Sequence, residues 1–286
     1  MELIDDKETV KIIGASERNN KIINSTVASI LSHTLVILIF NLTTAYFARR
    51  YNLFRKLYYF KVEFTRNLDS WQLYPVRMTF SMGPLLLLIL GVMCFIIQKQ
   101  ARKKPGVMKF FWLWLGIHFL NYFVANTILM PMSLRPQETP HLAIFATYMR
   151  WDDFTKLTLS IISSLLLILI GFLASKPFVQ TSNSTSQVAK IDNRAFYLFQ
   201  VVFVPFLFSS FINYFIFFNN FKMLNITSLV CLFVVVLSIF INGLRNKMIM
   251  VYRFPEVNEI NKKLLITLIL LILILKISPL NTGLQF

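Results

Sequence analysis

The sequence predicts an all-α, polytopic integral membrane protein with about seven transmembrane helices. Two totals support this prediction: 56% of the 286 residues are hydrophobic, and only 15% are charged. A soluble domain would carry about a quarter charged residues. The third observation is that the apolar residues form long uncharged blocks separated by short basic clusters. This pattern excludes a soluble enzyme, a disordered chain and a secreted disulfide scaffold.

Six blocks without Asp, Glu, Lys or Arg approach or exceed the roughly 20 residues that a helix needs to cross the hydrocarbon core of a bilayer. They are Ile22–Ala48, Met78–Gln98, Phe110–Leu134, Leu157–Ser175, Ala195–Phe221 and Met223–Leu244. A seventh block, Leu264–Leu275, is shorter, and Lys276 interrupts it before Ile277–Leu280. A lysine near a helix end can reach the headgroups, so we count this block as a span.

The blocks suggest two membrane halves. Residues 1–21 form a polar N-terminal tail, 22–176 a four-helix half, 177–194 a polar linker and 195–286 a three-helix C-terminal half. With seven spans, 17 of the 29 Lys and Arg lie on the side of the N-terminus. Basic loops favour the cytoplasmic side, so we expect the N-terminus in the cytoplasm, as in a bacterial inner membrane.

The first loop, residues 49–77, opposes this orientation because it is also strongly basic. Its middle, Leu53–Phe64, reads L-F-R-K-L-Y-Y-F-K-V-E-F and is expected to lie in the membrane interface or to form short strands. If the first block were re-entrant, this loop would be cytoplasmic and the conflict would disappear; both alternatives stay open. The predicted basic interface comprises Arg49, Arg50, Arg55, Lys56 and Lys61 here, and Arg102, Lys103 and Lys104 in the turn A-R-K-K-P-G.

Ionisable side chains near or inside the spans are the first candidates for chemistry. His33 and His118 lie in the first and third blocks, and Asp152 and Asp153 precede the fourth. These four residues are the only candidate metal ligands, although a zinc site needs three or four ligands. A structural interpretation competes with this one: the histidines bond to neighbouring helices, and an aspartate caps a helix.

Uncharged polar residues recur inside the blocks and are expected to hydrogen-bond between helices. They are Asn41, Thr43, Thr44, Asn121, Asn126 and Asn213. Alternatively, His118 and the last three asparagines line a polar path at mid-membrane. Two of the asparagines lie in similar pentapeptides, F-L-N-Y-F at 119–123 and F-I-N-Y-F at 211–215, in helices that would run in the same direction.

The order of features resembles that of the site-2-type intramembrane zinc metalloproteases. Phe40–Asn52 reads F-N-L-T-T-A-Y-F-A-R-R-Y-N, similar to the family's metal-binding helix and its A-R exit. The basic aromatic loop follows, then S-M-G-P-L-L-L at Ser81–Leu87 and W-D-D-F at 151–154. The resemblance covers Ile22–Lys176, just over half of the chain.

The residues that would carry the protease chemistry are absent. The resemblance places the two zinc histidines at Phe40 and Thr44 and the catalytic glutamate at Asn41, and only Asp152 or Asp153 could supply the third ligand. Phenylalanine does not bind zinc, and asparagine cannot act as the general base. The resemblance therefore implies a scaffold without this hydrolytic activity.

The sequence predicts a non-catalytic multi-pass membrane protein, a protease-like relic that binds a peptide or a partner protein in the bilayer. It contains no nucleotide fingerprint, and we expect neither a cofactor nor a nucleic-acid partner, because the basic residues flank membrane segments. Two alternatives remain: a transporter or channel component with a midplane polar path, and a membrane subunit of a larger complex.

Overall fold

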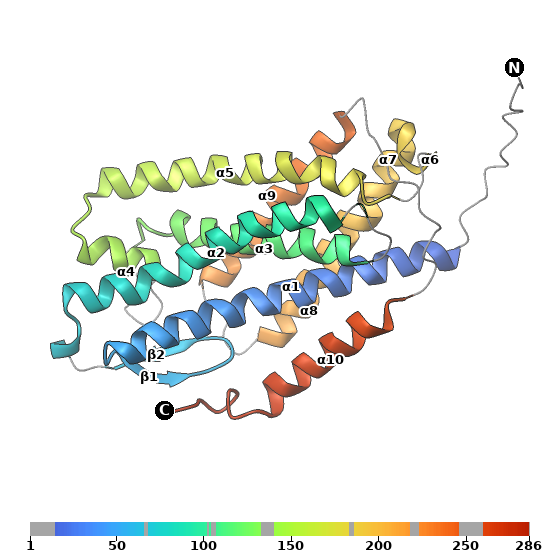
Figure 1. The fold of residues 1–286 in the computed structure, drawn as a ribbon. Helices are drawn as coiled ribbons and strands as arrows, with labels where there is room; N and C mark the ends of the chain where they lie inside the picture. Colours follow the sequence, from blue (N-terminus) through green and yellow to red (C-terminus); the bar gives the residue numbers. More distant parts are fainter. Residues whose placement is uncertain are drawn as a thin grey trace, which may run out of the picture.

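Long helices dominate the computed structural model, which describes residues 15–65, 68–101, 103, 107–132, 140–182, 186–217, 223–245 and 260–285. The helices lie along one another in an elongated bundle, with a small β-hairpin beside the end of α1 (Figure 1). The α-helices are α1 (Ala15–Arg50), α2 (Leu73–Ala101), α3 (Met108–Ile128), α4 (His141–Tyr148), α5 (Asp153–Val179), α6 (Ser186–Ala189), α7 (Ile191–Leu198), α8 (Val204–Phe217), α9 (Met223–Arg245) and α10 (Lys262–Ile277).

Five of the described helices are long and apolar enough to cross a membrane. They are Asn20–Arg50 within α1, Leu73–Ala101, Asp153–Val179, Ile191–Phe217 and Met223–Arg245. The other two predicted spans form helices outside this set, since α3 is made less apolar by its buried His118, Asn121 and Asn126, and α10 has only 16 residues. The all-α membrane class is therefore confirmed, whereas the count of about seven spans is not.

The first loop contains strands, as its sequence suggested. β1 (Phe54–Leu57) pairs antiparallel with β2 (Val62–Phe64), and the C-terminal tail adds a bridge in which Leu57 and Leu284 exchange backbone hydrogen bonds of 2.9 and 2.8 Å. Lys61 donates to Glu63 at 2.6 Å, and this contact lowers the pKa of the Glu63 carboxyl. Part of the basic excess of this loop is thus neutralised within the hairpin.

α1 is the central helix of the bundle because one of its faces is made of small residues. Ser25, Ala28, Ser29 and Ser32 recur every three or four positions and are buried, so they form one stripe. Small residues let membrane helices approach closely. Along its length α1 packs against α2, α3, α8 and α10.

One long helix, Ile191–Phe217, contains a π-turn at Phe199–Phe203 between α7 and α8. Its cause lies in the sequence, because Pro205 has no N–H to donate to the carbonyl of Val201. The Val204 N–H bonds instead to the Phe199 carbonyl, five residues back. This shift of register is the π-bulge typical of such interruptions.

Helices extend into the predicted linker 177–194 from both sides, and its described residues are folded. Thr181 and Ser182 are buried, and Thr181 Oγ1 lies 2.8 Å from the Tyr197 hydroxyl. Ser182 donates to Gln187 at 3.0 Å. Polar composition there reflects buried hydrogen bonds rather than a solvated tether. The short helices α4 and α6 are not predicted from the sequence.

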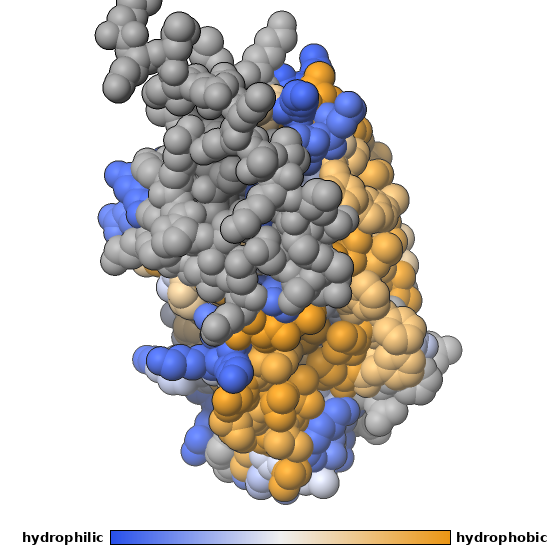
Figure 2. Space-filling view, turned by 90° about the vertical axis from the view of Figure 1, so that its right-hand side faces the viewer, coloured by the Kyte–Doolittle hydropathy of each residue, from blue (hydrophilic) through white to orange (hydrophobic). Residues whose placement is uncertain are grey.

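The outer surface of the bundle is apolar where a bilayer would cover it. Figure 2 shows a broad hydrophobic surface, with hydrophilic residues around it, beside the atoms drawn in grey. The exposed side chains include Ile161 and Leu165 on α5, Phe211 on α8, Val230 on α9 and Ile274 on α10. Large exposed hydrophobic residues on so many helices match a lipid-facing surface.

Close packing of α5 on α9 yields the first prediction. A Cβ atom added to Gly171 would lie 2.7 Å from the Val235 carbonyl oxygen, so Gly171→Val should force the helices apart. We expect the free energy of unfolding to fall by about 1–3 kcal/mol, measured as a lower melting temperature in detergent. The control Ser164→Val adds a branched side chain to an exposed position of the same helix, and an equal loss in this variant would contradict the prediction.

Candidate functional site

Hydrogen bonds in the middle of the bundle join α1 to α3 and to the helix that contains α8. Trp114 Nε1 donates to Ser25 Oγ at 2.9 Å, and Ser25 donates in turn to the Val201 carbonyl at 2.7 Å. This carbonyl lacks an N–H partner four residues ahead, because Pro205 occupies that position. The α1 serine therefore satisfies the carbonyl that the proline leaves open.

A second relay lies one turn further along α1. Ser209 donates to the Phe206 carbonyl at 3.2 Å, Ser29 donates to Ser209 at 3.0 Å, and His118 Nε2 lies 3.1 Å from Ser29 Oγ. Since each hydroxyl already uses its single proton, the relay assigns the N–H of His118 to Nε2. His118 donates to Ser29 and is not arranged to accept its proton, as a catalytic base would be.

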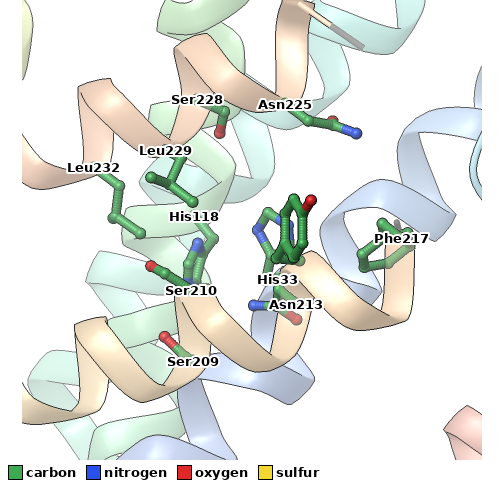
Figure 3. Close-up of a pocket in the computed structure, with 11 residues that line it drawn as sticks. His33, His118, Ser209, Ser210, Asn213, Phe217, Asn225, Ser228, Leu229 and Leu232 are labelled. Atoms are coloured by element: carbon green, nitrogen blue, oxygen red, sulfur yellow. The ribbon is translucent and has the colours of Figure 1, made fainter. Parts of the chain in front are cut away.

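Next to this relay, a small hollow opens between α8 and α9. His33 and His118 meet edge to face behind it, with ring centroids 5.2 Å apart. Figure 3 shows the surrounding side chains, which α1, α3, α8 and α9 contribute. From α8 and α9 the lining includes Ser210, Asn213, Tyr214, Asn225, Ser228 and Leu229. The hollow has a volume of about 20 Å³, which suits one water-sized group.

The hollow lies between α8 and α9, which scarcely touch each other. α8 packs mainly on α1, and α9 packs mainly on α5 and α3. Tyr214 at the rim is 36% exposed, while Ser210 and Leu229 are half-buried. An opening that combines a mostly apolar surface with a few polar groups therefore lies on an apolar side of the bundle.

α3 and α9 are joined by polar contacts. Asn121 Nδ2 donates to the Ser228 carbonyl at 2.7 Å and to its Oγ at 2.9 Å, and the Tyr122 hydroxyl donates to Asn225 Oδ1 at 3.4 Å. Asn213 on α8 is buried, but its Oδ1 accepts no hydrogen bond from the residues that the structure describes. This oxygen is an acceptor held beside the hollow.

The four candidate metal ligands do not come together. His33 and His118 are adjacent, whereas Asp152 and Asp153 lie at the exposed start of α5. Asp152 caps that helix by accepting from the Thr155 backbone N–H at 3.2 Å, and its contacts with Thr155 lower the pKa of its carboxyl. Within the described ranges, no group of three or more His, Cys, Asp or Glu side chains is placed to hold a metal ion.

Two of the predicted intramembrane polar residues bond within their own helices. Thr43 donates to the Ile39 carbonyl at 2.8 Å, and Asn126 donates to the Tyr122 carbonyl at 3.0 Å. Neither residue lines the hollow. Of the predicted polar path, only His118 and Asn213 line it, and Asn121 reaches it indirectly by bonding to Ser228.

The hairpin is anchored to three helices through Tyr59. Asn41 on α1 donates to the Tyr59 carbonyl at 3.2 Å, and the Tyr59 hydroxyl donates to the Ile216 carbonyl at the end of α8 at 3.0 Å. Lys276 on α10 donates to the same hydroxyl and to the same carbonyl, each at 3.0 Å. Lys276 is therefore bound by the protein, where the sequence suggested that it reaches the headgroups.

The positions that carry the protease resemblance lie beside one another. A Cβ atom on Gly83 would be 3.0 Å from Thr44 Oγ1 and 3.1 Å from the Phe40 ring. His141, at the start of α4, stacks on Phe40 with a centroid separation of 4.5 Å, and its Nδ1 lies 3.4 Å from Thr44 Oγ1. Sequence spacing alone gave no reason to place His141 in this group.

The predicted basic interface lies at both ends of the bundle. Arg49, Arg50 and Arg55 are exposed and Lys56 is half-buried near the hairpin, where Lys61 pairs with Glu63. Lys103 is exposed at the other end. Arg102 and Lys104 lie outside the described residues.

A buried arginine that the sequence analysis did not single out closes the far end of the bundle. Arg194, 4% exposed, donates from Nε to the Val188 carbonyl at 2.8 Å and from Nη1 to the Leu244 carbonyl at 3.2 Å. A longer contact of 3.5 Å reaches the Gly243 carbonyl. The guanidinium thus binds the free carbonyls at the end of α9, where the helix dipole favours a cation. An arginine just before a long apolar block was the one available signal.

Comparison with known proteins gives no family for this chain. No protein-family model, curated protein or solved structure matches it. Its function therefore has to be argued from the geometry alone.

Arg194 generates the second prediction. Arg194→Met keeps a long side chain but leaves several helix-end carbonyls without a donor, so we expect a loss of about 2–3 kcal/mol in the free energy of unfolding. Thermal melting in detergent measures this loss, and Arg194→Lys should recover part of it. Arg245→Met, at the exposed end of α9, is the matched control. The prediction fails if the two methionine variants melt alike.

Proposed function

We propose that this protein is a non-catalytic multi-pass membrane protein that binds a membrane segment of a peptide or partner protein at the opening between α8 and α9. The observation that supports this is the hollow itself: it opens between α8 and α9, whose outer faces are apolar, and its mostly apolar lining includes the polar side chains of Ser210 and Asn213. A soluble ligand would have to cross lipid to reach it. A segment already in the bilayer meets it directly.

The contacts of the polar groups support a binding role over a catalytic one. Ser29 and Ser209 each donate their proton to another oxygen of the protein, so neither is prepared as a nucleophile. The proposal includes the origin suggested by the protease resemblance. In that interpretation Phe40 and Thr44 of α1 stand where zinc ligands would be, and the chain retains the protease scaffold without its chemistry.

The proposal also includes seven spans, with α3 and α10 added to the five. α3 has 21 residues, a length of about 31 Å at 1.5 Å per residue. α10 begins just after Asn261, whose backbone N–H donates to Asn24 Oδ1 of α1 at 2.9 Å. It ends where Lys276 reaches Tyr59, which is bonded to Asn41 of α1, so α10 runs beside α1 between Asn24 and Asn41. This alternation keeps the most basic side, and with it the N-terminus, in the cytoplasm.

Photo-crosslinking at the rim of the opening tests the proposed docking. We replace Tyr214, which lines the hollow, by the photoreactive amino acid benzoylphenylalanine in the native membrane. The expected result is a discrete adduct with a second polypeptide, detected as a mobility shift on a denaturing gel and identified by mass spectrometry. Closing the opening with Ser210→Phe should reduce this adduct at least fivefold.

The matched control places the same photoreactive group at Phe172. This residue is 57% exposed on α5, a helix that contributes no residue to the lining of the hollow. Lipid adducts alone are expected there. If position 214 also yields lipid adducts alone, or if both positions capture the same polypeptides, the α8–α9 opening is not a docking site.

A further inference from the structure

The two similar pentapeptides of the sequence occupy different environments in the bundle. In α3, the Asn121–Tyr122 pair of F-L-N-Y-F binds α9 through Ser228 and Asn225. Ser228 and Asn225 are three residues apart and lie on one face of α9. α3 thus shows, within this chain, what an Asn-Tyr pair on a membrane helix can bind.

In α8, the corresponding pair of F-I-N-Y-F faces the hollow. Asn213 is 7% exposed, its Oδ1 has no hydrogen-bond donor among the described residues, and Tyr214 forms the rim beside it. A buried acceptor without a donor costs free energy. A hydroxyl-sized group in the 20 Å³ hollow would supply that donor.

The lining also restricts the charge of the group that enters. Every lining residue in the described part of the chain is a His, Ser, Asn, Tyr, Phe or Leu, so these residues bring neither a carboxylate nor a Lys or Arg side chain to the hollow. A buried ion without a counter-ion is strongly disfavoured. The entering group is therefore an uncharged donor.

We infer that the partner segment is a transmembrane helix that presents a serine or threonine hydroxyl to Asn213 Oδ1. This inference rests on the proposed function, because it names the chemistry recognised at the same opening. The hydroxyl fills the hollow, and the apolar remainder of the helix covers the exposed faces of α8 and α9, including Phe211 and Val230.

Two peptides that differ by one hydroxyl test the inference. Each is a 21-residue leucine-alanine helix flanked by lysines, one with a central serine and the other with a central alanine. Binding to the full-length protein in nanodiscs is measured by fluorescence energy transfer from a labelled peptide. We expect the serine peptide to bind about threefold more tightly, the effect of one interhelical hydrogen bond in a membrane.

Variants of the protein test whether Asn213 causes the preference for the serine peptide. Asn213→Ala should abolish the threefold difference, whereas Asn126→Ala, a matched change at another buried asparagine outside the hollow, should retain it. The comparison of the two peptides on the unmodified protein stands even if a variant does not fold.

The possible outcomes separate this inference from the proposed function. Equal binding of the two peptides would overturn donor recognition, with the hollow then holding only water, and would leave docking at the opening intact. Binding of neither peptide would overturn both. A preference that survives in Asn213→Ala would place the hydroxyl elsewhere and would also overturn the inference.

Discussion

The arrangement of this bundle depends on the requirement that polar groups inside a bilayer find their partners within the protein. The serines of α1 meet this requirement for three helices at once. Ser25 connects Trp114 of α3 to the carbonyl left open by Pro205, and Ser29 connects His118 to α8. Because both relays end on backbone carbonyls, a helix interruption and a serine stripe far away in sequence form one structural unit.

The same requirement explains why α3, the long helix outside the five candidate spans, lies inside the bundle. α3 carries His118, Asn121 and Asn126, and 15 of its 21 residues are buried. Contact with lipid would leave the His118 ring and the Asn121 side-chain N–H group without the partners they have in the bundle, at a cost of several kcal/mol each. Neighbouring helices therefore take the lipid-facing positions, which their exposed leucine, isoleucine and phenylalanine side chains match. Mean hydropathy identifies such a helix poorly, since the polar side chains that favour its burial also lower this value.

Local patterns were sufficient for the helix blocks, which follow from runs of apolar residues and their interruptions, and they gave strands in the first loop as one of two alternatives. They were insufficient where tertiary contacts decide. In the sequence, Arg194 belongs to a polar linker, and only the fold places the end of α9 beside it. His141 likewise contacts Phe40 and Thr44 only because of where α4 lies. The proximity of His33 and His118 likewise requires the packing of α1 on α3. These contacts join residues that are far apart in the chain, so no local sequence pattern predicts them.

The opening between α8 and α9 exists because α9 makes its main contacts with α3 and α5. Its polar pair, Asn225 and Ser228, is engaged by α3, and its small-residue contacts are engaged by α5, where Gly171 meets Ser238. α8 is held against α1 by the relay through Ser209. Because both helices pack on other neighbours, they do not pack closely on each other. The buried Asn213 Oδ1 therefore lies at the gap between them. The polar contacts that stabilise the bundle therefore also create the opening.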